Sequence, residues 1–109
     1  MGSSTGYMQE YQQAQRAYIQ GNYDEAAAAI DRLAENHPND PSVCLLRGHI
    51  YCGLQQYDTA RDQYQAVLGL TNDAEYVNYA NDGLAYVNQF SNGGAENLSD
   101  NDAFTDEGF

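Results

Sequence analysis

The sequence predicts an all-α fold of about five helices, arranged as antiparallel helix–turn–helix repeats. Apolar residues recur at intervals of three and four along most of the chain, which is helical spacing. The motif at residues 57–60, Tyr-Asp-Thr-Ala, returns 34 residues earlier at residues 23–26 as Tyr-Asp-Glu-Ala. At the same offset, Gly48 falls on another small residue, Ala14. Because stacked helix pairs repeat at such a period, the pattern predicts two pairs followed by one unpaired helix.

The first pair is predicted at about residues 7–20 and 23–36. Gly21 suits the C′ position that ends the first helix. Asn22 is the expected cap of the second, with Glu25 three residues later in capping-box spacing. The apolar face of the first helix consists of residues that recur at three and four: Tyr7, Tyr11, Ala14, Ala17 and Tyr18.

The second pair is predicted at about residues 41–53 and 57–70. Pro38 disfavours helical backbone at the residue before it, so the preceding helix ends near residue 36. Pro41 suits the first helical position, with Asp40 as its cap. The turn at Gln55-Gln56 replaces Gly21-Asn22 of the first pair and lacks a good cap. It is therefore expected to be the weaker of the two turns.

A fifth helix is predicted at about residues 74–90, with Asn72 and Glu75 in capping-box spacing. It is expected to cap the open end of the stack. The predicted organisation is a disordered start or tag remnant at 1–6, two helical units at 7–40 and 41–74, the capping helix at 74–90, and an acidic disordered tail or linker at 91–109. The tail prediction is compositional, since residues 95–109 hold five acids and no base.

The charge balance disfavours several classes of partner. The formal net charge is −12, with four arginines and sixteen acidic residues. Nucleic acids and anionic membrane surfaces both require clustered positive charge, so neither is expected as a partner. The chain has no apolar run of about 20 residues and no secretory signal pattern. Cys44 and Cys52 lie eight residues apart on one predicted helix, about 12 Å, which is too far for a disulfide. Reduced thiols favour a cytoplasmic location.

No catalytic or cofactor-binding pattern is present in the sequence. His49 and Cys52 have a usable i, i+3 spacing for a metal, but a structural zinc site requires four ligands. Acidic pairs such as Asp24-Glu25 are explained by the helix dipole. We therefore expect no enzyme activity, no metal and no cofactor.

The repeat resembles the tetratricopeptide repeat family over about residues 7–90. The resemblance rests on the small residues Gly48 and Ala60, with Ala14 and Ala26 at the same places one repeat earlier, on Pro38, and on aromatic positions at Tyr23, Tyr51, Tyr57 and Tyr64. In the family these small residues lie where the two helices of a repeat cross, so Gly48 is expected to face Ala60. The sequence departs from the family pattern at Glu10 and Cys44, which hold its Trp-like position, and at Asn72, which replaces a closing proline.

This resemblance implies a short right-handed superhelix that acts as a non-enzymatic scaffold for protein–protein interaction. Its concave groove would be lined by the first helix of each repeat and by the capping helix. The groove residues expected are Tyr11, Gln15, Tyr18, Leu45, His49, Cys52, Tyr79 and Tyr86. They include no Lys or Arg, which disfavours the carboxylate clamp of some family members and favours a basic or neutral segment with apolar anchors. The alternative is that several of these tyrosines pack between repeats.

A narrower resemblance concerns residues 46–51 and 83–90. These two sequence segments look like the N-terminal repeat region of cyanobacterial methyl-accepting chemotaxis proteins of the PilJ type. That resemblance implies a signalling context linked to type IV pili, in the cytoplasmic part of a membrane-associated receptor. Two alternative roles stay open: a self-association element forming a homo-oligomer, since few repeats leave an apolar end, and a regulatory segment of a larger protein.

Overall fold

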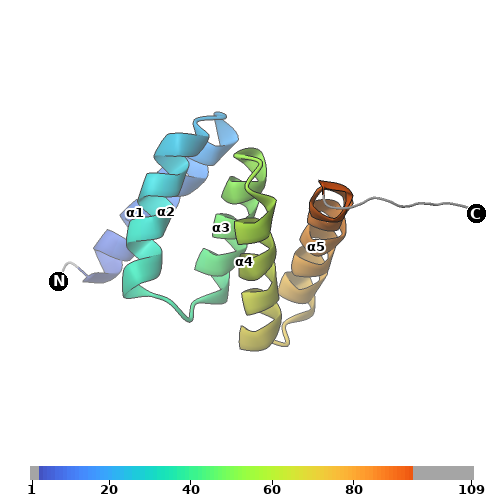
Figure 1. Cartoon of the computed structure of the whole chain (residues 1–109). Helices are drawn as coiled ribbons and strands as arrows, with labels where there is room; N and C mark the ends of the chain where they lie inside the picture. The colour runs from blue at the N-terminus through green and yellow to red at the C-terminus, as the bar shows by residue number, and fades with distance from the viewer. Residues whose placement is uncertain (1–2, 95–109) are drawn as a thin grey trace, which may run out of the picture.

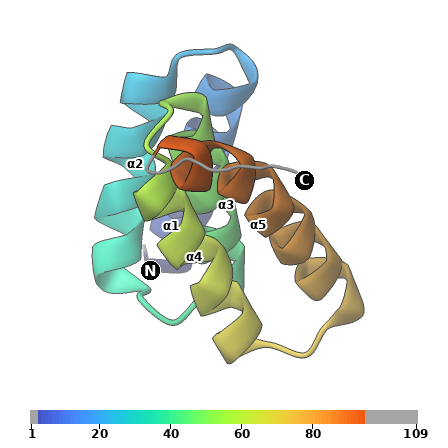
Figure 2. The same ribbon diagram turned by 45° about the vertical axis from the view of Figure 1, so that its right-hand side comes forward.

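The computed structural model describes residues 3–94 of the chain, which form five α-helices and, within that range, no strand. Figures 1 and 2 show the helices as two antiparallel pairs and a final helix placed in a row. The predicted all-α repeat fold is confirmed, and three of the five predicted ranges match residue for residue. The helices are α1 (Ser3–Ile19), α2 (Tyr23–Asn36), α3 (Pro41–Gly53), α4 (Tyr57–Leu70) and α5 (Ala74–Gly94).

The ends of the first and last helices differ from the prediction. Helix α1 begins at Ser3, four residues before its predicted start, and residues 3–6 form its first turn. Serine and threonine are tolerated in a first turn, where the amide groups lack helical partners in any case. Helix α5 continues past residue 90 to Gly94. The remaining part of the predicted acidic tail, residues 95–109, lies outside the described residues.

The turns within the two pairs share one backbone geometry. In the first, Gly21 has φ = +83°, its amide donates to the Tyr18 carbonyl, and the next amide donates to Ala17. In the second, Gln55 has φ = +63° and the two amides donate to Cys52 and Tyr51 in the same way. Both are Schellman motifs, in which glycine is favoured because it lacks a Cβ. The second turn thus holds a glutamine in a left-handed conformation that favours glycine, and its weakness stays a prediction.

Two of the three predicted capping residues occupy the N-cap position, and one of these two makes the side-chain bond. The Asp40 carboxylate accepts the Ser42 amide, as predicted, and Pro41 opens α3. Asn22 occupies the N-cap of α2 but makes no side-chain capping bond, because its backbone (ψ = 72°) is not extended. At α5 the cap is Asp73, which accepts the Glu75 amide at 3.0 Å, and not Asn72. The chain enters α5 one residue later than the predicted capping box requires.

The core is continuous along the stack and depends on a buried tyrosine ring. One cluster joins α1, α2 and α3, and a second joins α3, α4 and α5 around Tyr64, which is 1% exposed. A Cβ at Gly48 would lie 2.8 Å from the Tyr64 ring, and one at Gly83 would lie 2.3 Å from it. The Tyr64 ring is thus held between glycines of α3 and α5. The three atoms nearest to a Cβ added at Gly48 all belong to the Tyr64 ring, so the close approach at this position is to Tyr64 and not, as predicted, to Ala60.

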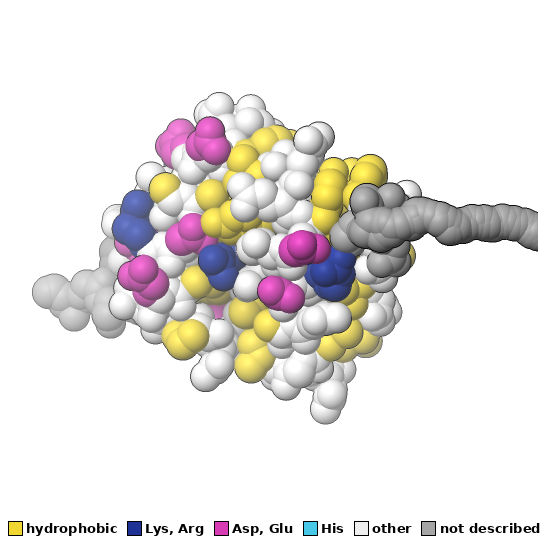
Figure 3. Space-filling model, in the orientation of Figure 1, with side chains coloured by type: hydrophobic (Ala, Val, Ile, Leu, Met, Phe, Trp, Pro, Cys, Tyr) yellow, Lys and Arg dark blue, Asp and Glu magenta, His cyan; other side chains and the backbone are white. Residues whose placement is uncertain are grey.

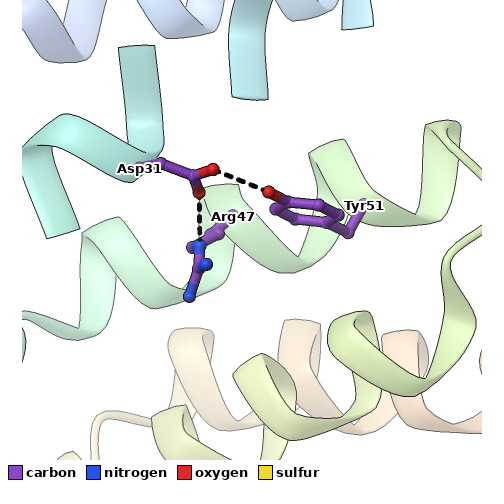
Figure 4. Close-up of polar contacts among 3 residues, drawn as sticks. All are labelled: Asp31, Arg47 and Tyr51. Carbon is purple, nitrogen blue, oxygen red and sulfur yellow. Dashed lines mark hydrogen bonds and ion pairs between the residues drawn. The ribbon is translucent and has the colours of Figure 1, made fainter. Parts of the chain in front are cut away.

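Ionic contacts join neighbouring helices on the face that carries α2 and α4. There, Asp31 of α2 accepts the Arg47 Nε and the Tyr51 hydroxyl of α3, each at 2.7 Å (Figure 4). Arg47 also lies 5.3 Å from the centre of the Tyr51 ring. Figure 3 shows the arginine atoms on this face, each beside acidic side chains. The positive charge visible there is therefore paired.

None of the described helices is long and apolar enough to cross a membrane.

Candidate functional site

A hollow of about 380 Å³ opens where α1, α3 and α5 converge. All five helices contribute to its lining, so it exists only in the assembled stack. Its volume lies within the range of small-ligand and side-chain pockets. The lining residues are Tyr18, Tyr23, His49, Cys52, Gly53, Tyr64, Tyr79, Asp82, Gly83 and Tyr86.

The floor of the hollow is a hydrogen-bonded cluster centred on Tyr64. The His49 Nδ1 lies 2.8 Å from the Tyr64 hydroxyl, and the Cys52 sulfur lies 3.4 Å from the same oxygen. Tyr18 stacks against His49 with ring centres 6.2 Å apart. These contacts link α1, α3 and α4, and they fix the imidazole between two aromatic rings.

The floor is uncharged at neutral pH. Burial lowers the pKa of His49 below its ordinary value, so the imidazole is neutral. Burial, followed by the Cys52 contacts, raises the pKa of Tyr64 far above its usual range. Desolvation also raises the pKa of the Cys52 thiol, although the Tyr64 hydrogen bond acts in the opposite direction. A thiol with a raised pKa is a poor nucleophile. The floor is therefore a polar but neutral surface.

The walls are tyrosine rings from opposite ends of the stack. Tyr18 of α1 and Tyr23 of α2 form one wall, with ring centres 5.8 Å apart. Tyr79 and Tyr86 of α5 line the other side, and they are 49% and 46% exposed. The Tyr23 ring can reach this position because Gly53 has no Cβ. A Cβ there would lie only 2.8 Å from the ring. Two pairs of tyrosines thus flank the neutral floor.

A second group of rings extends the wall toward the carboxyl end of α5. Phe90 stacks on Tyr57 of α4 with ring centres 4.5 Å apart and an interplanar angle of 11°. Tyr86 contacts both rings, at 6.3 Å and 4.9 Å. Phe90 is still 41% exposed. The hollow therefore continues into an exposed aromatic surface rather than ending at Tyr86.

Five of the eight predicted groove residues lie together at the hollow: Tyr18, His49, Cys52, Tyr79 and Tyr86. The other three do not line it. Tyr11 stacks on Tyr7, 6.1 Å away, and packs against the first core cluster. Leu45 packs against the second cluster. Gln15 is exposed beside Arg16 and Ile19. Gln15 lies three residues before Tyr18, so its side chain is offset by about 60° around the α1 axis and does not reach the hollow.

Five lining residues were not among the predicted groove residues: Tyr23, Gly53, Tyr64, Asp82 and Gly83. Asp82 lies between Tyr79 and Tyr86, three and four residues from them, so helical spacing places it beside them. That signal was available in the sequence. Tyr64 and Tyr23 come from the second helix of each pair, and their reach into the hollow depends on Gly48, Gly53 and Gly83. Helical periodicity does not predict this close approach.

The lining of the hollow has the composition of a recognition surface. In the described part of the chain, no group of three or more His, Cys, Asp or Glu side chains is placed to hold a metal ion. His49 and Tyr64 are bonded to each other, and the neighbouring thiol has a raised pKa. The lining contains no Lys or Arg and one carboxylate, Asp82. Exposed rings around a neutral floor are suited to binding a side chain.

Comparison with known proteins gives a family match over most of the helical region. The model of the tetratricopeptide repeat matches residues 17–80, more than half of the chain. Tetratricopeptide repeat protein 16 of Homo sapiens is 41% identical over 58 residues, and its counterpart in Macaca fascicularis is 38% identical over 60.

The matched stretches are 52% and 54% of this chain, but only 7% of each relative. This chain therefore corresponds to a small part of those long proteins. No solved structure matches. The similarity concerns the repeat itself and carries no information about what the rest of either relative does.

Proposed function

Because the chain belongs to the tetratricopeptide repeat family, whose members are generally non-enzymatic scaffolds for protein–protein interaction, we propose that its concave hollow binds a segment of a partner protein. The favoured segment is basic or neutral and carries apolar anchors. Tyr18, His49, Cys52, Tyr79 and Tyr86 would form the binding surface. The helices serve as a rigid frame that holds these side chains in place before the partner arrives.

The observation that carries this proposal is the exposure of the α5 tyrosines. Tyr79 and Tyr86 remain about half exposed although they border a hollow lined by all five helices. A tyrosine serving only to pack two repeats would be covered, as Tyr64 is. Tyrosine is also favoured in binding sites, since it offers a large rigid surface with little conformational entropy to lose.

Charge supports a basic or neutral partner. The first 94 residues hold eleven acidic residues and all four arginines, a formal net charge of −7. Asp82 is the charged side chain of the hollow's lining. A basic segment would therefore be attracted over long range, and its association should slow as salt is added.

The test is selection of a random peptide library displayed on phage against the whole chain. Enriched peptides are then titrated calorimetrically against the parent, Tyr79→Ala and Tyr86→Ala. Each variant should bind at least about fivefold more weakly than the parent, as expected for an anchor residue. Ile19→Ala is the control, because Ile19 is 75% exposed and lies away from the hollow. Unchanged binding by both tyrosine variants, with helicity intact, would refute the proposal.

Self-association is disfavoured by the outward face of α5. The residues exposed on the side of α5 away from the hollow are mostly polar: Asn78, Asn81, Asn88 and Gln89. A polar outer face is what a capping helix of a repeat stack requires. Sedimentation of the chain as a monomer would support this view.

We also propose a cytoplasmic location, from the reduced thiols. The PilJ-type signalling context stays a prediction, and neither curated relative bears such a name.

A further inference from the structure

We propose that the hollow is a cation-binding cage, and that the anchor it takes is a lysine or arginine side chain of the bound segment. This inference rests on the proposed function, and it goes further by assigning the chemistry of one subsite. The segment would insert a positive charge among Tyr18, Tyr23, Tyr79 and Tyr86, with Asp82 at its side.

The first argument is the arrangement of rings. Four tyrosines from three helices border one hollow, and their ring faces carry negative electrostatic potential. The Tyr18 and Tyr23 rings are tilted by 45° and lie 5.8 Å apart, so they present a concave aromatic corner. Such corners bind organic cations by attraction to the ring quadrupoles, while the same rings cover the aliphatic stem of the side chain.

The second argument is the balance of charge at the site. Asp82 is exposed on α5 beside Tyr79 and Tyr86, and none of the lining residues described is Lys or Arg. His49 is the one lining group able to become positive near neutral pH, and burial lowers its pKa. A cation entering the hollow thus meets an acid and neutral partners only.

The third argument is that the arginines of this chain are placed elsewhere. Arg47 is held by Asp31 at 2.7 Å, and Arg32 lies 3.9 Å from Glu10. Arg61 lies 3.1 Å from Asp58. Arg16 lies with Gln15 and Ile19, at a separate part of α1. The cage is therefore not filled by a cation of the same described chain.

The direct test needs no partner. The whole chain, labelled with ¹⁵N, is titrated with N-acetyl-lysine methylamide, N-acetyl-arginine methylamide and N-acetyl-norleucine methylamide. Norleucine carries the aliphatic stem without the charge. We expect the amide signals of Tyr18, Cys52, Asp82 and Gly83 to shift with lysine or arginine, and to remain unshifted with norleucine. Equal shifts with norleucine, or none with either cation, would overturn the inference.

Variants separate the ring face from plain apolar area. Tyr79→Phe keeps the ring, whereas Tyr79→Leu keeps an apolar side chain without it. Binding of the cationic probe should survive Tyr79→Phe and weaken about three- to tenfold in Tyr79→Leu. Asp82→Asn should weaken it as well, and Glu75→Gln, an exposed acid on the same helix, should not. Equal loss in the Phe and Leu variants would contradict a role for the ring face.

Failure of this inference is distinguishable from failure of the proposed function. Suppose library selection yields peptides that need Tyr79 and Tyr86 but bind equally well after every Lys and Arg is replaced by norleucine. The groove then stands and the cation cage is wrong. If no peptide is enriched, yet the lysine probe shifts the hollow's signals, the cage stands and the peptide groove is wrong.

Discussion

At the residue scale, the two left-handed turn positions form a natural matched pair. Gly21 and Gln55 hold the same place in equivalent Schellman turns, with φ values of +83° and +63°. A residue with a Cβ loses about 1 kcal/mol or more in this conformation. Gln55→Gly should therefore stabilise the chain by about 0.5–1 kcal/mol, and Gly21→Gln should destabilise it by a similar amount.

Urea unfolding followed by circular dichroism measures both effects. The two variants must move in opposite directions for this explanation to hold. Destabilisation by Gln55→Gly would show that the glutamine side chain makes a stabilising contact, and that backbone strain is not the dominant effect.

The glycines around Tyr64 give a second prediction at this scale. A methyl group at Gly83 would lie 2.3 Å from Tyr64 Cζ, and the ring cannot move freely because its hydroxyl is bonded to His49. Gly83→Ala should cost about 1–3 kcal/mol through overpacking. Gly69→Ala is the control, since nothing lies within 4 Å of its added Cβ. It should stabilise α4 by up to about 1 kcal/mol. Thermal unfolding of both variants checks the pair, and equal midpoints would contradict it.

At the scale of elements, one carboxylate adds polar contacts to the apolar junction between the repeats. Asp31 of α2 accepts hydrogen bonds from Arg47 and Tyr51 of α3. Removing it leaves a half-buried guanidinium without that partner, so Asp31→Ala should cost about 1–2 kcal/mol. Glu35→Ala, one turn later and exposed, should have little effect. The free energy of unfolding in urea is the measurement, and an equal, small loss in both variants would show that the network adds nothing.

Sequence reasoning succeeded for the elements whose signals are local. The bounds of α2, α3 and α4 follow from Pro38, Pro41 and the 34-residue offset, and the structure reproduces them. Sequence reasoning failed where the backbone conformation of a connection determines the cap. Asn22 has the residue type of a cap but not the backbone angles, and the cap of α5 moved from Asn72 to Asp73 because the connection is not a copy of the first.

The candidate site divides in the same way. The resemblance to the repeat family implied that Tyr18, His49, Cys52, Tyr79 and Tyr86 line one groove, and the structure places them around one hollow. Gln15 was predicted to line the groove, but it is exposed on another side of α1. The floor was missed for another reason: Tyr64 reaches it only because Gly48 and Gly83 leave room, and their contact with its ring appears only in three dimensions.

At the scale of the whole molecule, His49 couples the hollow to pH. Its folded pKa is lowered by burial, so the unfolded chain binds a proton that the folded chain disfavours. The contribution of His49 to the free energy of unfolding should therefore be fully present above the ordinary histidine pKa of about 6.5. It should be lost as pH drops below that value. The neighbouring groups are Tyr18, Tyr64 and Cys52, all neutral in this range, and the Asp82 carboxylate.

Urea unfolding at pH 7.5 and pH 5.5 tests this coupling. The loss of stability between the two should shrink in His49→Gln and persist in His37→Gln, whose ring packs on Tyr7 instead. A loss of the same size in His49→Gln as in the parent would assign the effect to other groups.

The most direct test of the central claim, that the concave hollow binds the partner segment, is an amide chemical-shift map of the whole chain with a library-selected peptide. The account predicts that the largest shifts belong to Tyr18, His49, Cys52, Gly83 and Tyr86, from α1, α3 and α5. Shifts confined to the face of α2 and α4, around Asp31 and Arg47, with the hollow unchanged, would contradict it.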